Sequence, residues 1–162
     1  MQPHKAVILY VEDSDDHAFL FERAARPYKK ISIRRVCDGE EAKAYLCSIL
    51  ESGNPADRPT AVVTDFHMPR CNGLELLRWL HEHPVWHTLP AVVLSSSMSC
   101  EDTDRCYGAG ARAYFVKPCT SNGFAHLFEC LIKYWTKQDI LDCIQNESAA
   151  EHALHSSEPT KI

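Results

Sequence analysis

Short apolar runs alternate with longer amphipathic segments along most of the chain. Near-continuous apolar runs lie at 5–11, 61–65, 90–94 and 113–116, and residues 31–36 alternate apolar with polar side chains. Apolar runs of this length predict strands covered on both faces, and the alternation predicts a strand nearer an edge. The segments between them carry apolar residues at helical spacing. The pattern therefore predicts five strands, each followed by a helix.

Capping residues and helix breakers mark the ends of the predicted helices. Ser14 can cap the first helix, whose first turn is acidic, and Asp38/Glu41 and Asn72/Glu75 have the spacing of a capping box. The helices are expected from Ser14 to Pro27, Asp38 to Leu50, Asn72 to Pro84, Cys100 to Ala109 and Ser121 to Trp135. The expected inward stripe of the first helix is Phe19, Leu20, Arg23 and Ala24.

Strands and helices that alternate over short links predict an α/β fold with a doubly wound, five-stranded parallel sheet. Right-handed crossovers would place helices on both faces of this sheet. Residues 1–136 are predicted to form this one domain. Residues 137–162 are predicted to be an acidic C-terminal tail, with a short helix near its start and disorder from Glu147 onward.

The composition narrows the classes of partner and the compartment. A net charge of −5 argues against direct nucleic-acid binding. No apolar run approaches the ~20 residues of a membrane span, and the first residues lack the apolar core of a signal peptide. The eight cysteines are scattered without a Cys-x-x-Cys pair, which favours reduced thiols over a disulfide or zinc framework. We therefore expect a cytoplasmic protein with no membrane partner.

Polar residues follow four of the five predicted strands. Glu12 and Asp13 follow the first strand, Asp65 ends the third, Ser95 follows the fourth and Lys117 follows the fifth. Because the carboxyl ends of parallel strands meet at one edge of a sheet, these side chains are expected to share one crevice. Taken singly, each has an ordinary explanation: acids that cap a helix, serines of a turn, a surface lysine. Their combination at the strand ends favours a functional site.

The residue types in this crevice suit phosphoryl transfer. Three carboxylates at close range repel one another unless a cation is present, and Mg²⁺ prefers hard oxygen ligands. Asp65 could then attack phosphorus as a carboxylate nucleophile. Lys117 would neutralise a phosphoryl oxygen, and Ser95 could donate a hydrogen bond to another.

The same residues give the chain a resemblance to the receiver domain of two-component response regulators. The resemblance runs from Ala6 to about Trp135. Its motifs are Glu12-Asp13, Asp65-x-x-Met68-Pro69 with Gly73 following, Ser95, and Tyr114-x-x-Lys117-Pro118. It implies a flavodoxin-like sheet with strand order 2-1-3-4-5. It also implies a signalling module that catalyses only its own phosphorylation and slow dephosphorylation.

The resemblance implies a role for each residue of the motifs. Asp65 would accept a phosphoryl group from a histidine kinase. Asp13, Asp65 and the main-chain carbonyl of His67 would hold Mg²⁺, with Glu12 acting mostly through bound water. Ser95 would be the switch hydroxyl and Tyr114 the aromatic residue that follows it. The bond before Pro118 is expected to be cis.

The chain departs from the common pattern of the family at two places, and the second bears on its partners. Ser95 stands where threonine is more common, and the loop at 51–60 is longer than in the minimal family member. The longer loop, without an attached output domain, is similar to small regulators that partner bacterial phytochromes. A phytochrome-type histidine kinase is therefore one expected partner. The other is a downstream protein target or a histidine phosphotransfer protein. The apolar face of the fourth helix region, the fifth helix with Trp135, and the tail could support a homodimer.

Three functions stay open from the residues. The leading hypothesis is a stand-alone response regulator that switches a protein-interaction surface, and one variant of it is an intermediate of a phosphorelay. A phosphatase with an aspartyl nucleophile would need a second acid close after Asp65, but His67 occupies the position two residues later. A module that only binds partners would not need the full set of acids with Lys117.

Overall fold

The computed structural model of the chain describes residues 5–134, and its strands and helices alternate as the apolar pattern predicts. The strands are β1 Ala6–Val11, β2 Ile31–Val36, β3 Ala61–Asp65, β4 Ala91–Ser95 and β5 Ala113–Val116. The helices are α1 Asp15–Ala25, α2 Gly39–Ser52, α3 Gly73–Glu82, α4 Cys100–Gly108 and α5 Ser121–Tyr134. Short 3₁₀ turns at Pro55–Asp57 and Trp86–Thr88 precede β3 and β4. The predicted tail and Trp135 lie outside the described residues.

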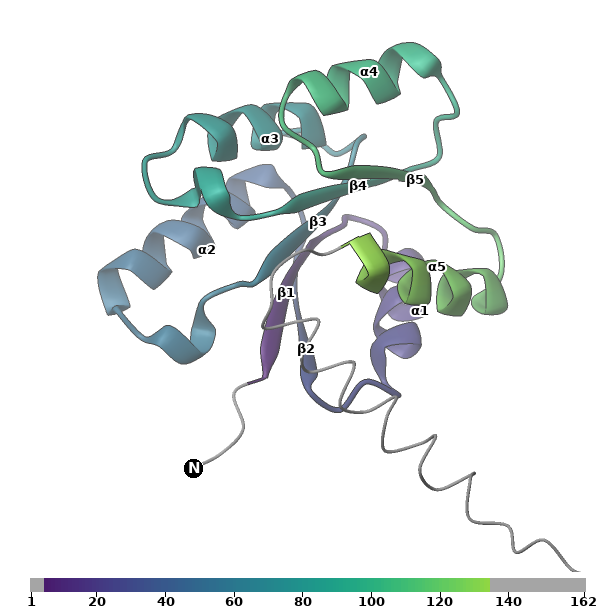
Figure 1. Cartoon of the computed structure of the whole chain (residues 1–162), viewed down its shortest axis with the longest axis horizontal. Helices are drawn as coiled ribbons and strands as arrows, with labels where there is room; N and C mark the ends of the chain where they lie inside the picture. Colours follow the sequence, from purple (N-terminus) through teal and green to yellow (C-terminus); the bar gives the residue numbers. More distant parts are fainter. Residues whose placement is uncertain (1–4, 135–162) are drawn as a thin grey trace, which may run out of the picture.

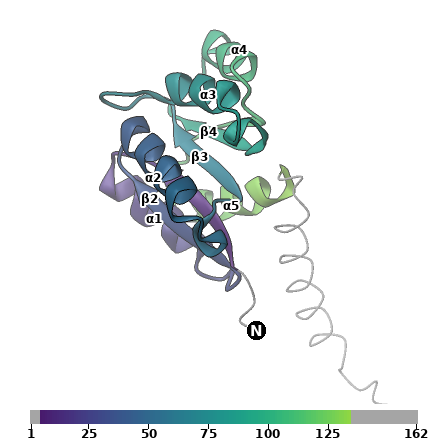
Figure 2. The same cartoon turned by 90° about the vertical axis from the view of Figure 1, so that its left-hand side faces the viewer.

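The five strands form one parallel sheet in the order β2-β1-β3-β4-β5, which confirms the predicted fold class. The sheet is the middle layer of three: α1 and α5 lie side by side on one face, and α2, α3 and α4 cover the other (Figures 1 and 2). All five strands therefore end at the same edge of the sheet, where the predicted site residues follow them.

Each face of the sheet has its own apolar core. On the α1/α5 face, Phe21 stacks on Tyr10 of β1 with ring centroids 4.0 Å apart and meets Phe128 of α5 edge-on at 5.4 Å. On the other face, leucines of α2 and α3 pack on β1 and β3 around Trp86. Because β1 and β3 contact both cores, their residues are almost fully buried, as their continuous apolar runs predict.

The predicted stripe of α1 is wrong in part. Phe19 is 53% exposed, with the Arg26 guanidinium 5.9 Å from the centre of its ring, whereas the buried residues of this helix are Ala18, Phe21, Ala24 and Ala25. Consecutive apolar residues at 18–21 fit two neighbouring faces of a helix equally well. The fit of Phe21 between Tyr10 and Phe128 decides which face turns inward.

The helix caps are formed largely as predicted. The Ser14 hydroxyl accepts from the His17 amide, and Asn72 and Glu75 form a complete capping box. At α2, Asp38 accepts from the Glu41 amide as expected, but the Glu41 carboxylate accepts from the amide of Cys37 instead of that of Asp38.

Two further observations concern the helices and the cysteines. No helix among residues 5–134 is long and apolar enough to cross a bilayer. The seven cysteines in this part of the chain are all unpaired thiols.

Candidate functional site

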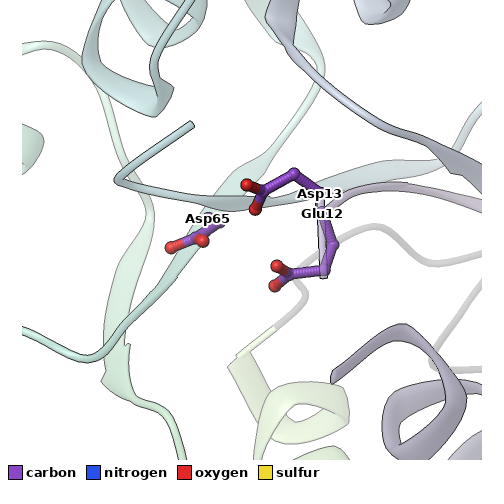
Figure 3. Close-up of side chains that lie close together, drawn as sticks. All are labelled: Glu12, Asp13 and Asp65. Carbon is purple, nitrogen blue, oxygen red and sulfur yellow. The ribbon is translucent and has the colours of Figure 1, made fainter. Parts of the chain in front are cut away.

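Three carboxylates meet at the edge of the sheet where the strands end. Glu12 and Asp13 follow directly on β1, and Asp65 is the last residue of β3 (Figure 3). Each offers a carboxylate oxygen within 4.8 Å of the others. Glu12 and Asp65 are buried, whereas Asp13 is exposed. The site is therefore open to solvent on the Asp13 side.

The local backbone places Asp65 with little freedom. Its Oδ1 accepts from the Phe66 amide at 2.7 Å, and the Gly73 amide donates to the Phe66 carbonyl at 3.0 Å. This contact brings the start of α3 against the end of β3. A Cβ on Gly73 would overlap the carbonyl oxygen of Asp65, so the close approach requires glycine.

Lys117 brings the one buried cation of the site. Its side chain is 4% exposed, and Nζ lies 2.6 Å from Glu12 Oε2 and 2.9 Å from Asp65 Oδ2. Three carboxylates and one ammonium leave a net charge of −2, counted from these four groups. A divalent cation would balance this charge, and the hard oxygen donors on an open site suit Mg²⁺. The residues present therefore fit the predicted metal.

Glu12 is held by protein contacts from three directions. Its Oε2 accepts from the Tyr10 hydroxyl at 3.3 Å, its Oε1 accepts from the Ser14 amide at 3.1 Å, and its carbonyl accepts from Arg35 Nε at 3.1 Å. Burial, followed by the charge of Glu12, raises the pKa of Tyr10 far above its usual range, so this phenol remains a donor. With these contacts and Lys117, Glu12 has little capacity left for direct coordination. Asp13 is freer to bind a metal.

The structure places the remaining predicted ligand nearby. His67 is exposed, and its ring meets Phe66 edge-on at 4.6 Å. It lies in the loop that leaves Asp65. That its main-chain carbonyl coordinates the metal stays a prediction.

Hydroxyl groups connect the end of β4 to α4. The buried Ser95 Oγ accepts from the Ser97 amide at 3.1 Å, and the Tyr114 hydroxyl donates to the Ser97 carbonyl at 2.8 Å. Ser97 Oγ in turn donates to Asp102 of the first turn of α4 at 2.6 Å and accepts from the Ser99 amide at 3.2 Å. The predicted switch hydroxyl and the predicted aromatic residue thus share Ser97 as a partner.

The expectation of a cis bond before Pro118 is wrong. The peptide bonds of residues 5–134 are all trans. Trans is the intrinsically preferred form even before proline. Here the amide of Lys117 pairs with the Ser95 carbonyl at 2.8 Å, so the parallel pairing of β4 and β5 extends to the residue before the proline without a cis bond.

Sequence reasoning missed two contacts: one within the site, and one at what we call its rim, the pair formed by Asp38 and Arg70. The Nδ1 of His17 lies 3.2 Å from Lys117 Nζ, although the two residues are a hundred positions apart. At the rim, Arg70 binds the buried Asp38. Burial alone would raise the pKa of Asp38, but the Glu41 amide and Arg70 outweigh it and hold that pKa below its ordinary value.

The fold and this geometry define a signalling receiver. The response regulator receiver domain model matches residues 8–144. The chain therefore belongs to the family of response regulator receiver domains, as its motifs predict.

Similar proteins are found among known sequences and solved structures. The chain is 30% identical over 133 residues to the probable methanogenesis regulatory protein FilR2 of Methanothrix harundinacea, covering 80% of this chain and 83% of FilR2. It resembles the phosphorylated cyanobacterial phytochrome response regulator RcpA with a TM-score of 0.72 and 27% identity, over 81% of this chain and 94% of RcpA. A response regulator of red-light signalling from R. palustris gives a TM-score of 0.72 at 26% identity, over 82% and 94% of the two chains.

Proposed function

We propose that this chain is a stand-alone response regulator in which Asp65 accepts a phosphoryl group from a histidine kinase. The observation that carries the proposal is the position of Lys117, whose ammonium bridges Glu12 and Asp65 inside the acidic cluster. A carboxylate with a buried cation beside it and a divalent metal site in front of it is suited to receive a phosphoryl group, because that transfer depends on positioning and charge.

The residues would share the work of the transfer. The Asp65 carboxylate forms an O–P bond while the N–P bond of a phosphohistidine breaks, and the leaving imidazole takes a proton. Lys117 moves its hydrogen bond from the Asp65 carboxylate to a phosphoryl oxygen. When bound at Asp13 and Asp65, Mg²⁺ supplies charge neutralisation for the phosphoryl oxygens. No second acid follows Asp65 at the position of His67, which disfavours a phosphatase acting on other substrates.

The hydroxyl contacts support a switching step. In the structure Ser95 Oγ accepts from the Ser97 amide; turning this hydroxyl toward a phosphoryl oxygen would release Ser97. Ser97 also holds Tyr114 and the first turn of α4, so its release would alter both. Met98, which follows Ser97, is 82% exposed, and Tyr107 of α4 and Val116, paired with Ser95 across β4 and β5, are also exposed. We infer that these apolar side chains belong to the protein-interaction surface that phosphorylation changes.

A histidine kinase of the phytochrome type is the proposed partner. The support is the similarity to two solved response regulators, one described as a phytochrome response regulator and one as part of red-light signalling. The long segment between α2 and β3 is a feature of this chain that fits such regulators. Transfer of the phosphoryl group from Asp65 to a histidine phosphotransfer protein would instead make the chain a phosphorelay intermediate.

The first experiment tests Asp65 directly. The protein is incubated with Mg²⁺ and acetyl phosphate, and intact mass is measured beside an Asp65→Asn variant. A metal-dependent gain of one phosphoryl group in the wild type, absent in the variant, supports the proposal. The lack of any adduct, together with no phosphate release above background, would contradict it.

A further inference from the structure

The ammonium of Lys117 has three acceptors, and one of them comes from outside the acidic cluster. A lysine side chain can donate three hydrogen bonds and accept none. Glu12 Oε2 and Asp65 Oδ2 take two of them at 2.6 and 2.9 Å, and His17 Nδ1 lies at 3.2 Å. Because Lys117 can only donate, Nδ1 of His17 is the acceptor in this contact.

Several contacts hold His17 in this position. It lies in the first turn of α1, where its amide donates to the Ser14 hydroxyl. Its ring centroid lies 6.3 Å from that of the buried Phe124 of α5. Nδ1 is also 3.8 Å from Glu12 Oε1, and the side chain is 37% exposed. The ring is therefore partly open to solvent while its Nδ1 contacts the buried ammonium.

We propose that His17 is a positioning residue for phosphorylation of Asp65, acting through Lys117. This inference rests on the proposed function. When the phosphoryl group arrives, Lys117 gives up its bond to Asp65 but can keep those to Glu12 and His17. Two retained acceptors on different elements define where the ammonium sits. With Glu12 as its sole retained acceptor, the ammonium could rotate about that contact, and its hydrogen bond to the phosphoryl oxygen would be poorly oriented.

The test compares two substitutions that separate hydrogen bonding from packing. His17→Leu keeps apolar bulk beside Phe124 but removes the acceptor, whereas His17→Gln retains a carbonyl oxygen that can accept from Lys117. His126→Leu, which removes an exposed histidine of α5, is the matched control. The donor is phosphoramidate with saturating Mg²⁺, since a small donor excludes effects on the docking of a kinase.

The rate of phosphoryl incorporation is followed by intact mass, with Mg²⁺ affinity by calorimetry and thermal stability measured on the same samples. We expect His17→Leu to lower the rate about three- to tenfold, the effect of one hydrogen bond to a charged group at a partly exposed site. His17→Gln is expected to recover most of the rate. Mg²⁺ affinity and the melting temperature should stay close to those of the wild type, as should every property of His126→Leu.

The outcomes distinguish failure of this positioning role from failure of the proposed function on which it rests. If the wild type takes up no phosphoryl group, the proposed function fails. If the wild type is phosphorylated and His17→Leu matches it, the positioning role alone is overturned. Equal loss of rate in His17→Leu and His17→Gln would also overturn it, because the ring itself would then matter instead of the acceptor. A slow His17→Leu with a fast His17→Gln establishes the role.

Discussion

The loops that follow β1 and β4 meet at the same edge of the sheet but are held by different kinds of contact. The first is fixed by charge: Glu12 is fully buried and paired with Lys117. The second is fixed by hydroxyls, which link Ser95, Ser97 and Tyr114. A buried ion pair costs several kcal/mol to break, about 3–5, whereas a neutral hydrogen bond contributes about 1. The two loops therefore suit different tasks: one keeps its geometry, and the other can change partners.

The largest expected effect comes from breaking the Glu12–Lys117 ion pair, which holds the loop after β1. Lys117→Met leaves two carboxylates buried without their cation, and without Mg²⁺ it should lower the free energy of unfolding by about 3 kcal/mol. The same change makes the cluster more negative, so Mg²⁺ should bind more tightly and restore part of the loss. Urea unfolding with and without Mg²⁺ measures both effects.

Lys43→Met is the control for this change, since Lys43 pairs with the exposed Glu40 at 3.1 Å on the surface of α2. It should cost less than about 1 kcal/mol, with no dependence on Mg²⁺. Equal losses in the two lysine variants would show that Lys117 is not held as a buried ion.

The backbone beneath Asp65 should give the next largest effect. Gly73→Ala puts a methyl group against the carbonyl of Asp65, and the backbone must shift to admit it. We expect a loss of about 1–3 kcal/mol in unfolding free energy and slower phosphorylation, because the shift moves the acceptor. Gly108→Ala is the control: its Cβ would meet open space in α4, so the change should be neutral or stabilising. A neutral Gly73→Ala would contradict the close approach.

Changes in the loop after β4, which is held by hydroxyl groups, should alter the free energy of unfolding less. Tyr114→Phe removes the bond to the Ser97 carbonyl and should cost about 1 kcal/mol. Amide hydrogen exchange should rise in the loop at 96–99 while the β1 loop stays protected. Tyr107→Phe, on the exposed face of α4, should leave both loops unchanged. Faster exchange at the β1 loop in Tyr114→Phe would mean that the two loops are not independent.

The smallest effect is expected at the rim, and it depends on pH. Hydrogen bonds hold the pKa of Asp38 below its usual value of 3.8, so this carboxylate stabilises the fold at pH values above about 4 and loses that contribution as the pH falls through its lowered pKa. Arg70→Gln removes one of these bonds and should reduce stability at pH 7, and this deficit should shrink as the pH is lowered toward 2. Thermal unfolding across this range measures the difference, and Arg78→Gln on the exposed face of α3 is the control. A deficit that persists unchanged at pH 2 would show that Asp38 is not its cause.

Local signals in the sequence were sufficient for most of the fold. Asn72 and Glu75 carry their capping geometry within four residues, and the run ending at Asp65 specifies a buried strand by itself. Phe19 was misplaced because the choice between adjacent helix faces depends on the rings of Tyr10 and Phe128, which are distant in sequence. Local patterns can define an element without fixing its rotation.

The site could be predicted where its residues end strands, and not where they approach from elsewhere. Glu12, Asp65 and Lys117 follow from the topology, since parallel strands end together. The contact of His17 with Lys117 depends instead on how α1 packs beside α5, which no short spacing encodes. The trans bond before Pro118 was missed because the cis expectation came from the family resemblance and not from a signal in the neighbouring residues.

The order of the strands also bears on self-association. Among residues 5–134, β2 and β5 are the outer strands of the sheet, and an outer strand can recruit a strand from another molecule. β2 carries the exposed Arg34, whose charge disfavours pairing with another copy of this strand. The other outer strand, β5, is only four residues long, but it carries the exposed Val116. If concentrated solutions of this protein form intermolecular β-structure, growth should therefore begin at β5, and a charge at Val116 should suppress it.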